Sequence, residues 1–253
     1  MAEGDTILRA ARRIEAALDG TVEVSAPNPR GRAARIERLD GREFERAGAH
    51  GKHLLLHFGE LVLHSHLGMS GSWHVYRRGE PWRKPPGAAW AVLSTERAEA
   101  VQFGGPTLRL LRAEAVRRDP VLARLGPDIL APDFDAERIA GSLASLPDRS
   151  VGDALLDQRL VAGIGNIFKS EACFAAHLDP WQQVTDVPGE QLRHVVQAAH
   201  ELMHEAVEDG RQDRAVYKRA GRPCPRCGTP IRSRGQGDAN RTTYWCPSCQ
   251  LSR

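Results

Sequence analysis

The sequence predicts an α+β protein built from several domains, and three observations support this. A helical pattern opens the chain and is followed by short strand-like segments up to residue 118. From Asp119 the pattern becomes helical and stays so to Gly210. Four of the five cysteines then form two C-x-x-C pairs near the end of the chain. A length of 253 residues has room for two or three such units.

The first unit is expected to be a β-sandwich or small barrel with one leading helix. Within residues 6–18 apolar side chains recur at the spacing of one helix face, and Gly20 follows as a stop signal. The strand-like segments are short, apolar and bounded by Gly, Pro or charged turns. They lie at residues 21–25, 53–58, 61–66 and 89–94.

The middle of the chain is expected to contain four helices. Asp133 is placed to cap a helix that ends at Leu143. The other three are expected at residues 150–156, 166–177 and 188–208. Gly163 and Gly165 permit a tight turn before the third of these helices, and Asn166 is placed to cap it.

The cysteine pairs predict a closed metal site. Cys224 and Cys227 are separated from Cys246 and Cys249 by 18 residues, a spacing that lets two knuckles place four thiolates around one Zn²⁺. Because no oxygen or imidazole ligand replaces a thiolate, we expect a structural zinc ion in a β-hairpin ribbon. An iron–sulfur cluster or a redox pair is the alternative reading.

Charge is unevenly distributed along the chain. Residues 211–253 hold ten Lys and Arg against two Asp, a net charge of +8, so the preceding residues carry −5 of the total of +3. A basic terminal unit on an acidic body is typical of a polyanion contact, and a solvated basic tail is the alternative.

The composition favours a cytoplasmic protein. No apolar run has the length of a membrane span, and the first residues are acidic where a secretory signal would be basic. In that compartment thiols stay reduced, which favours metal ligation over disulfides. Cys173 stands alone in an apolar helical pattern and is expected to be a small buried side chain rather than a reactive thiol.

Several segments, in order along the chain, resemble the formamidopyrimidine-DNA glycosylase/endonuclease VIII family. The resemblance implies a catalytic β-sandwich domain over residues 1–118, a helix-two-turn-helix DNA-binding domain over 119–215 and a zinc-finger domain over 216–253. The segments that carry it are MAEGDT at the start, AHGKHLLLHF (49–58), HLGMSGSW (66–73), DQRLVAGIGNIFKSEACFAAHLDP (157–180), VYKRAGRPCPRCG (216–228) and NRTTYWCPSCQ (240–250).

The resemblance also implies catalytic roles. In this family the initiator Met is removed, and the exposed proline amine attacks the deoxyribose C1′; here that position is Ala2. An α-amine has a reference pKa near ~8, so a nucleophilic fraction exists at neutral pH. Ala2 lacks the secondary amine and ring of proline. Glu3 matches the general acid, whereas Lys52 and Arg241 match residues that contact phosphate and assist elimination. Without the motifs, Glu3, Lys52 and Arg241 would look like ordinary surface residues.

Further positions match DNA-binding residues of the family. Met69 lies in a glycine-flanked loop, where an unbranched side chain can fill the gap left by a flipped nucleotide. Gly165 and Asn166 at a helix start suit a phosphate oxygen, although a plain helix cap would look the same. Arg124 aligns with a DNA-contacting arginine of endonuclease VIII-like members.

The implied partner is damaged double-stranded DNA, bound by a monomer associated with the nucleoid, without membrane contact or small-molecule cofactor. The short segment 211–216 and the residues Gly4-Asp5-Thr6 favour the endonuclease VIII branch and oxidised pyrimidines. The segment 101–111 departs from the family's intercalating pattern. A lesion-binding or abasic-site-binding protein with weakened catalysis is the alternative function, since Ala2 replaces proline. A generic zinc-ribbon module that binds nucleic acid is a third.

Overall fold

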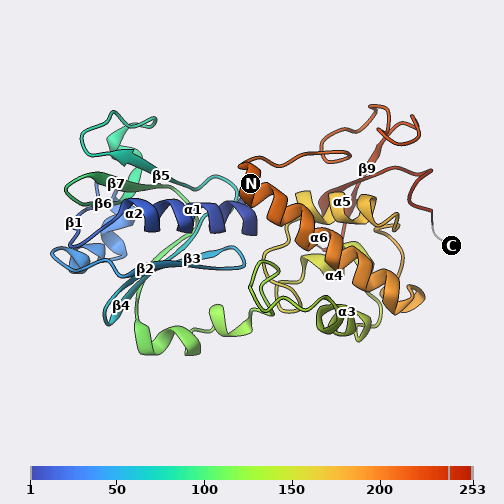
Figure 1. Ribbon diagram of the computed structural model, residues 1–253, viewed down its shortest axis with the longest axis horizontal. Coiled ribbons are helices and arrows are strands. Elements are labelled where there is room, and N and C mark those ends of the chain that lie inside the picture. Colours follow the sequence, from blue (N-terminus) through green and yellow to red (C-terminus); the bar gives the residue numbers. More distant parts are fainter. Residues whose placement is uncertain (1, 239, 252–253) are drawn as a thin grey trace. The chain divides into compact units, whose positions relative to one another are not determined.

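The computed structural model describes residues 2–238 and 240–251 and divides into two units, the first ending at Arg124 and the second beginning at Leu125 (Figure 1). The α+β class, the leading helix, the helical middle and the terminal β-hairpin agree with the sequence-based prediction.

The first unit is a sandwich of two four-stranded antiparallel sheets with a long helix, α1 (Gly4–Ala17), packed against strands of both. Three of the expected strands, at 53–58, 61–66 and 89–94, have the predicted bounds. One sheet has the order β1 (Glu23–Ser25), β6 (Ala89–Ser94), β7 (Ala98–Phe103), β5 (Ser72–Arg77). The other has the order β2 (Arg46–His50), β3 (His53–Phe58), β4 (Leu61–His66), β8 (Thr107–Arg112). A short helix, α2 (Pro29–Ala33), follows β1.

The core of this unit lies between α1 and the inner faces of the sheets. Ile7 and Ile14 of the helix are fully buried, as are Leu54 of β3 and Leu63 of β4. Side chains alternate across a strand, so the neighbours of these leucines, among them His64, lie on the outer face of the second sheet.

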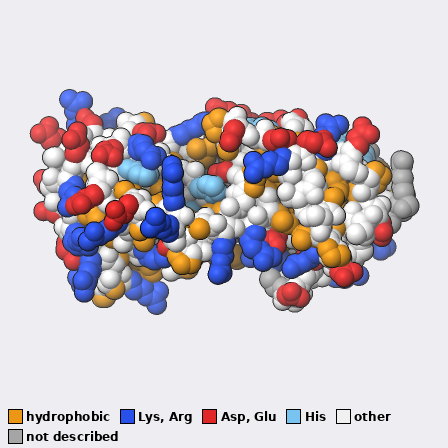
Figure 2. Space-filling view, turned by 90° about the horizontal axis from the view of Figure 1, so that it is seen from below, with side chains coloured by type: hydrophobic (Ala, Val, Ile, Leu, Met, Phe, Trp, Pro, Cys, Tyr) orange, Lys and Arg blue, Asp and Glu red, His pale blue; other side chains and the backbone are white. Residues whose placement is uncertain are grey.

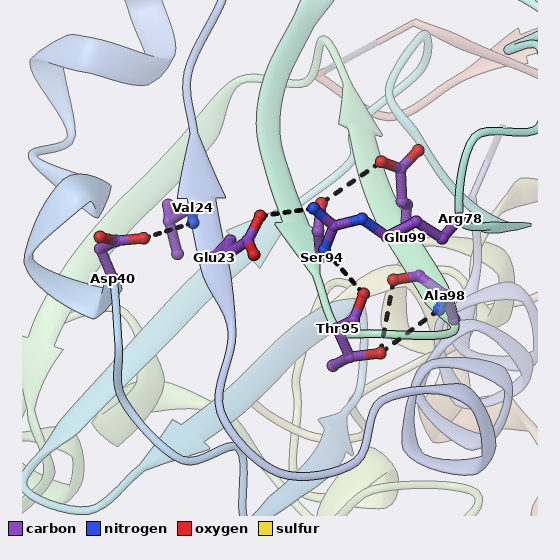
Figure 3. Close-up of polar contacts among 8 residues, drawn as sticks. All are labelled: Glu23, Val24, Asp40, Arg78, Ser94, Thr95, Ala98 and Glu99. Atoms are coloured by element: carbon purple, nitrogen blue, oxygen red, sulfur yellow. Dashed lines mark hydrogen bonds and ion pairs between the residues drawn. The ribbon is translucent and has the colours of Figure 1, made fainter.

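A group of polar contacts ties the short strand β1 into the unit (Figure 3). The Arg78 guanidinium donates to the Thr95 carbonyl at 2.8 Å and forms an ion pair with Glu23. The Val24 N–H donates to Oδ1 of Asp40, also at 2.8 Å. The Glu23 side chain is 72% exposed, and such ion pairs contribute at most about 1 kcal/mol, so the backbone ladder to β6 is the main restraint.

The described residues of the second unit form four α-helices followed by a β-hairpin. The helix expected at residues 150–156 is present, with Ser150 as its N-cap, but the preceding helix begins at Ala136 rather than near Asp133. The reason is that Asp135 accepts the Arg138 N–H at 3.0 Å and is therefore the N-cap. The elements are α3 (Ala136–Ala144), α4 (Val151–Leu156), α5 (Asn166–Ala175), α6 (Gly189–Asp209), β9 (Arg232–Gln236) and β10 (Arg241–Trp245). Among the described residues, no helix has the length and apolarity needed to cross a membrane.

Candidate nucleic-acid interface and zinc site

The start of the chain lies against the loop that contains Met69. The Ala2 backbone nitrogen donates to the Gly68 carbonyl at 3.4 Å, so the predicted nucleophile and this loop are neighbours. Glu3 is fully buried at the N-cap position of α1, and its side chain does not cap that helix. A carboxylate at this position is stabilised by the positive end of the helix dipole.

The Met69 loop is a tight turn that presents one apolar side chain. The Gly71 N–H donates to the Leu67 carbonyl at 2.8 Å, and Met69 is 75% exposed. A Cβ on Gly71 would lie 2.5 Å from that carbonyl oxygen, so the turn requires glycine there. The conformation is therefore suited to inserting Met69 into a gap rather than burying it in a core.

A hollow of about 690 Å³ beside this loop was not anticipated from the sequence. Arg30 lies over the Trp90 ring at 5.5 Å, and Lys84 lies over the Phe103 ring at 5.3 Å. Cations and aromatic rings together suit a nucleobase or a phosphate. No spacing pattern links these four positions, because the fold brings them together from α2, β6, β7 and the loop before β6.

Lys52 lies in a two-residue hairpin turn between β2 and β3, where His50 pairs with His53. Gly51 has a φ of +56°, which gives the turn its sharp reversal. Lys52 is half-buried, and its charge, after burial, is a cause of the lowered pKa of His66. His66 lies two residues before Gly68, so Lys52 is at the same end of the sheet as the Met69 loop.

In the second unit, the helix start and the hairpin are joined. Gly165, not Asn166, occupies the N-cap position of α5, so the expected side-chain cap by Asn166 is wrong. The Asn166 amide instead donates to the Thr242 carbonyl at 2.7 Å, next to Arg241. Arg241 is exposed at the first position of β10 and borders a hollow of about 210 Å³.

Two residues that the sequence did not single out hold this arrangement. Gln158 accepts the Gly163 N–H at 3.1 Å and donates to the Ile164 carbonyl at 3.0 Å, which fixes the loop before α5. Lys169 is fully buried in α5, and its ammonium donates to the Thr243 hydroxyl of the hairpin. The only sequence signal for Lys169 was a charged residue in an apolar helical pattern.

The four finger cysteines fit one zinc ion. Their sulfur atoms lie within 4.8 Å of one another, with Cys224 to Cys249 at 3.9 Å and Cys227 to Cys246 at 3.5 Å. A tetrahedral site with Zn–S bonds of about 2.3 Å requires sulfur separations of about 3.8 Å. The predicted structural zinc site therefore agrees with the geometry.

Arg124 and Cys173 are two further positions singled out by the sequence analysis. Arg124 is exposed in a short 3₁₀ turn, the last residue of the first unit. Cys173 is fully buried in α5, as expected, and burial raises the pKa of its thiol to about 12, which disfavours the reactive thiolate. Ala2, Glu3, Lys52 and Met69 belong to the first unit, whereas Gly165, Asn166, Arg241 and the finger cysteines belong to the second.

Comparison with known proteins gives matches along nearly the whole chain. Residues 1–107 match the formamidopyrimidine-DNA glycosylase N-terminal domain, 125–216 the H2TH domain of that enzyme, and 221–251 a zinc finger found in FPG and IleRS. The chain is 42% identical to a probable endonuclease 8 2 of Streptomyces coelicolor, over 99% of this chain and 94% of that protein. It is 36% identical to the DNA-(apurinic or apyrimidinic site) lyase Nei2 of Mycolicibacterium smegmatis, over the full length of both.

The fold is also similar to that of solved structures. A Lactococcus lactis formamidopyrimidine-DNA glycosylase bound non-covalently to DNA with an AP site superposes with a TM-score of 0.86. The superposition covers 99% of this chain and all of the other, at 22% identity.

Proposed function

Because this chain belongs to the formamidopyrimidine-DNA glycosylase/endonuclease VIII family, we propose that it excises oxidised bases from duplex DNA. The observation that carries the proposal is the contact of the Ala2 nitrogen with Gly68, beside the exposed Met69. Nucleophile and wedge then act on the same nucleotide, because flipping a base leaves a gap next to the sugar from which it came.

The reaction uses an amine and a buried carboxyl group. After removal of the initiator Met, the Ala2 amine attacks C1′ while the bond from C1′ to the base breaks, and the base leaves with a proton. Glu3 supplies a proton to the sugar or the base, a task suited to a buried carboxyl group. The amine nitrogen then loses a proton, the ring oxygen O4′ gains one, and the bond from C1′ to O4′ breaks, so that the opened sugar is joined to the nitrogen as a protonated Schiff base. Removal of a C2′ proton expels the 3′ phosphate, and Lys52 and Arg241 bind phosphates during this step.

Ala2 favours a second candidate function, a protein that binds lesions or abasic sites with little turnover. A primary amine can form an imine, so the chemistry is retained in principle. The ring of proline, which would fix the approach of the nitrogen, is missing. A lyase step slower than base excision therefore belongs to the proposal.

The preferred lesion is an oxidised pyrimidine. The connection from α6 to the finger is short and is held by Glu171, whose carboxylate accepts the backbone N–H groups of Ala215, Val216 and Tyr217 at 2.7–3.1 Å. A segment fixed in this way has no spare length to fold over a flipped purine.

Borohydride trapping on abasic and thymine-glycol duplexes tests the proposal, with the wild-type chain, Ala2→Pro and Glu3→Gln compared. We expect a covalent adduct with wild type, a stronger one with Ala2→Pro, and loss of base release with Glu3→Gln at unchanged affinity. Lys52→Gln, compared with the exposed control Lys218→Gln, shows whether the amine that forms the adduct belongs to Lys52 rather than to Ala2. If neither wild type nor Ala2→Pro forms an adduct or releases a base, the lesion-binding function replaces this proposal.

A further inference from the structure

Four polar side chains form a line that begins at Asp119, just after the 3₁₀ turn that follows β8, and crosses the neighbouring strands β8, β4 and β3 of the second sheet. Asp119 lies 3.1 Å from the Arg109 guanidinium, which also lies 2.9 Å from Nδ1 of His64. Nε2 of His64 lies 2.8 Å from Nδ1 of His53. The line ends beside the turn that contains Lys52, because His53 is the first residue of β3.

The direction of these hydrogen bonds is fixed by chemistry. A guanidinium only donates, so Nδ1 of His64 accepts and carries no proton. Neutral His64 then bears its proton on Nε2, which donates to Nδ1 of His53. His53 in turn bears its proton on Nε2, on the far side of its ring. Protonation of Nδ1 in either ring would place two donors face to face.

We propose that this chain of bonds holds His53 as a neutral hydrogen-bond donor to a phosphodiester oxygen of duplex DNA at the Gly51–Lys52 turn. The inference rests on the proposed function, since it takes duplex DNA as the ligand. Lys52 provides the positive charge that attracts the phosphate, and His53 adds an uncharged hydrogen bond that orients it.

The surroundings keep both rings neutral. Burial, followed by electrostatic interactions with His66, His64, His50 and Arg109 that disfavour a protonated ring, lowers the pKa of His53 to about 3. Burial and Arg109 lower the pKa of His64 to about 4, against the opposing effect of Asp119. The donor therefore stays unchanged across the physiological pH range.

The histidines do not form a metal site. Within residues 2–238 and 240–251, only the finger cysteines bring three or more ligand atoms close enough to hold an ion. The nitrogens of His53 and His64 that face each other are joined through a proton, and Arg109 occupies the other nitrogen of His64. Figure 2 shows histidine side chains beside Lys and Arg on one face of the molecule, a setting that suits phosphate.

Salt-dependent binding to a duplex with a reduced abasic site separates a neutral donor from a cation. We expect His53→Ala to weaken binding about tenfold at every salt concentration, with an unchanged slope of log K against log salt. Lys52→Gln lowers that slope by about one. His53→Gln, which keeps a neutral donor, restores most of the loss. His57→Ala, on the same strand and face, is the matched control and changes neither quantity.

Nitrogen NMR of the imidazole rings tests the proton positions without any variant. We expect the Nε2–H form for His53 and His64 between about pH 5.5 and 8. In Arg109→Gln the guanidinium no longer faces Nδ1 of His64, so this ring can take up a proton at low pH. The added positive charge should strengthen DNA binding of the variant as pH falls. Binding of the wild-type chain, which uses neutral His53, should stay constant. A charged His53 near pH 6, or His53→Ala binding as wild type, overturns the inference.

Failure of the proposed function gives a different result. A wild-type chain that releases no base but loses affinity on His53→Ala would refute excision and leave this inference standing. If the wild-type chain excises normally and His53→Ala binds the duplex equally well, excision stands and this inference is refuted. No affinity for the duplex would overturn both.

Discussion

Replacing Thr243 by valine removes one hydroxyl from the contact between the finger hairpin and α5. This hydroxyl accepts from the Lys169 ammonium and donates to Oε1 of Gln236 at 2.6 Å. Thr243 and Lys169 are both fully buried. Valine has the same shape and strand preference, so the substitution tests the polar contact alone.

The expected loss is about 2–3 kcal/mol of unfolding free energy. A hydrogen bond to a charged group contributes about 1.5–3 kcal/mol, and the neutral bond to Gln236 contributes about 1 kcal/mol. The buried methyl group offsets about 0.8 kcal/mol of this. Oε1 of Gln236 remains 3.4 Å from the Lys169 ammonium, so that charge keeps an acceptor and the larger penalty of an isolated buried charge is avoided.

Urea unfolding followed by tryptophan fluorescence measures this loss, because Trp245 lies on the same strand and its ring is 5.5 Å from that of Trp181. Zinc release, followed with a chelating dye, reports the finger separately. Thr242→Val is the matched control, since this neighbour on β10 is exposed. If the unfolding free energies of the two variants differ by less than about 0.5 kcal/mol, the hydrogen bond from Lys169 to the hydroxyl does not stabilise the protein, and the reasoning is refuted.

Three further predictions concern zinc, DNA distortion and pH. Cys246→Ala should release zinc and abolish DNA binding, because structural zinc contributes roughly 10–16 kcal/mol to the folding of such modules. The control Cys173→Ala should retain the metal. Metal analysis measures the zinc content, and fluorescence anisotropy of labelled DNA measures binding. Met69→Ala should slow base excision at least tenfold in a nicking assay. The stability of this variant should be unchanged, since the side chain is 75% exposed. Val121→Ala, an exposed control, should excise at the wild-type rate. Burial holds the pKa of His64 at about 4, below the unfolded value near 6.5, so the folded state resists protonation and loses stability as pH falls. The loss of unfolding free energy reaches roughly 2 kcal/mol at pH 5. In His64→Gln the unfolding free energy measured with urea should therefore depend less on pH. Parallel plots of unfolding free energy against pH for the variant and the wild type would contradict this prediction.

The strands 53–58, 61–66 and 89–94 could be predicted because their apolar pattern and turn residues are local properties. The leading helix is predictable for the same reason, but the apolar pattern starts it at residue 6 rather than at Gly4, since Glu3 gives no side-chain cap. The α3 start was misplaced because Asp133 and Asp135 are equally good caps in sequence, and only the backbone geometry selects Asp135.

The sequence by itself determined the order of α+β elements along the chain and predicted the zinc ligands and the family-like residues, because each depends on residue type at short spacing. The tertiary structure alone decided which of them meet. Asn166 bonds to Thr242 and Lys169 to Thr243 across more than seventy residues. The line from Asp119 to His53 likewise depends on the register of three strands. Such pairings follow from how sheets and helices dock, which is fixed by the packing of the whole core and by no local pattern.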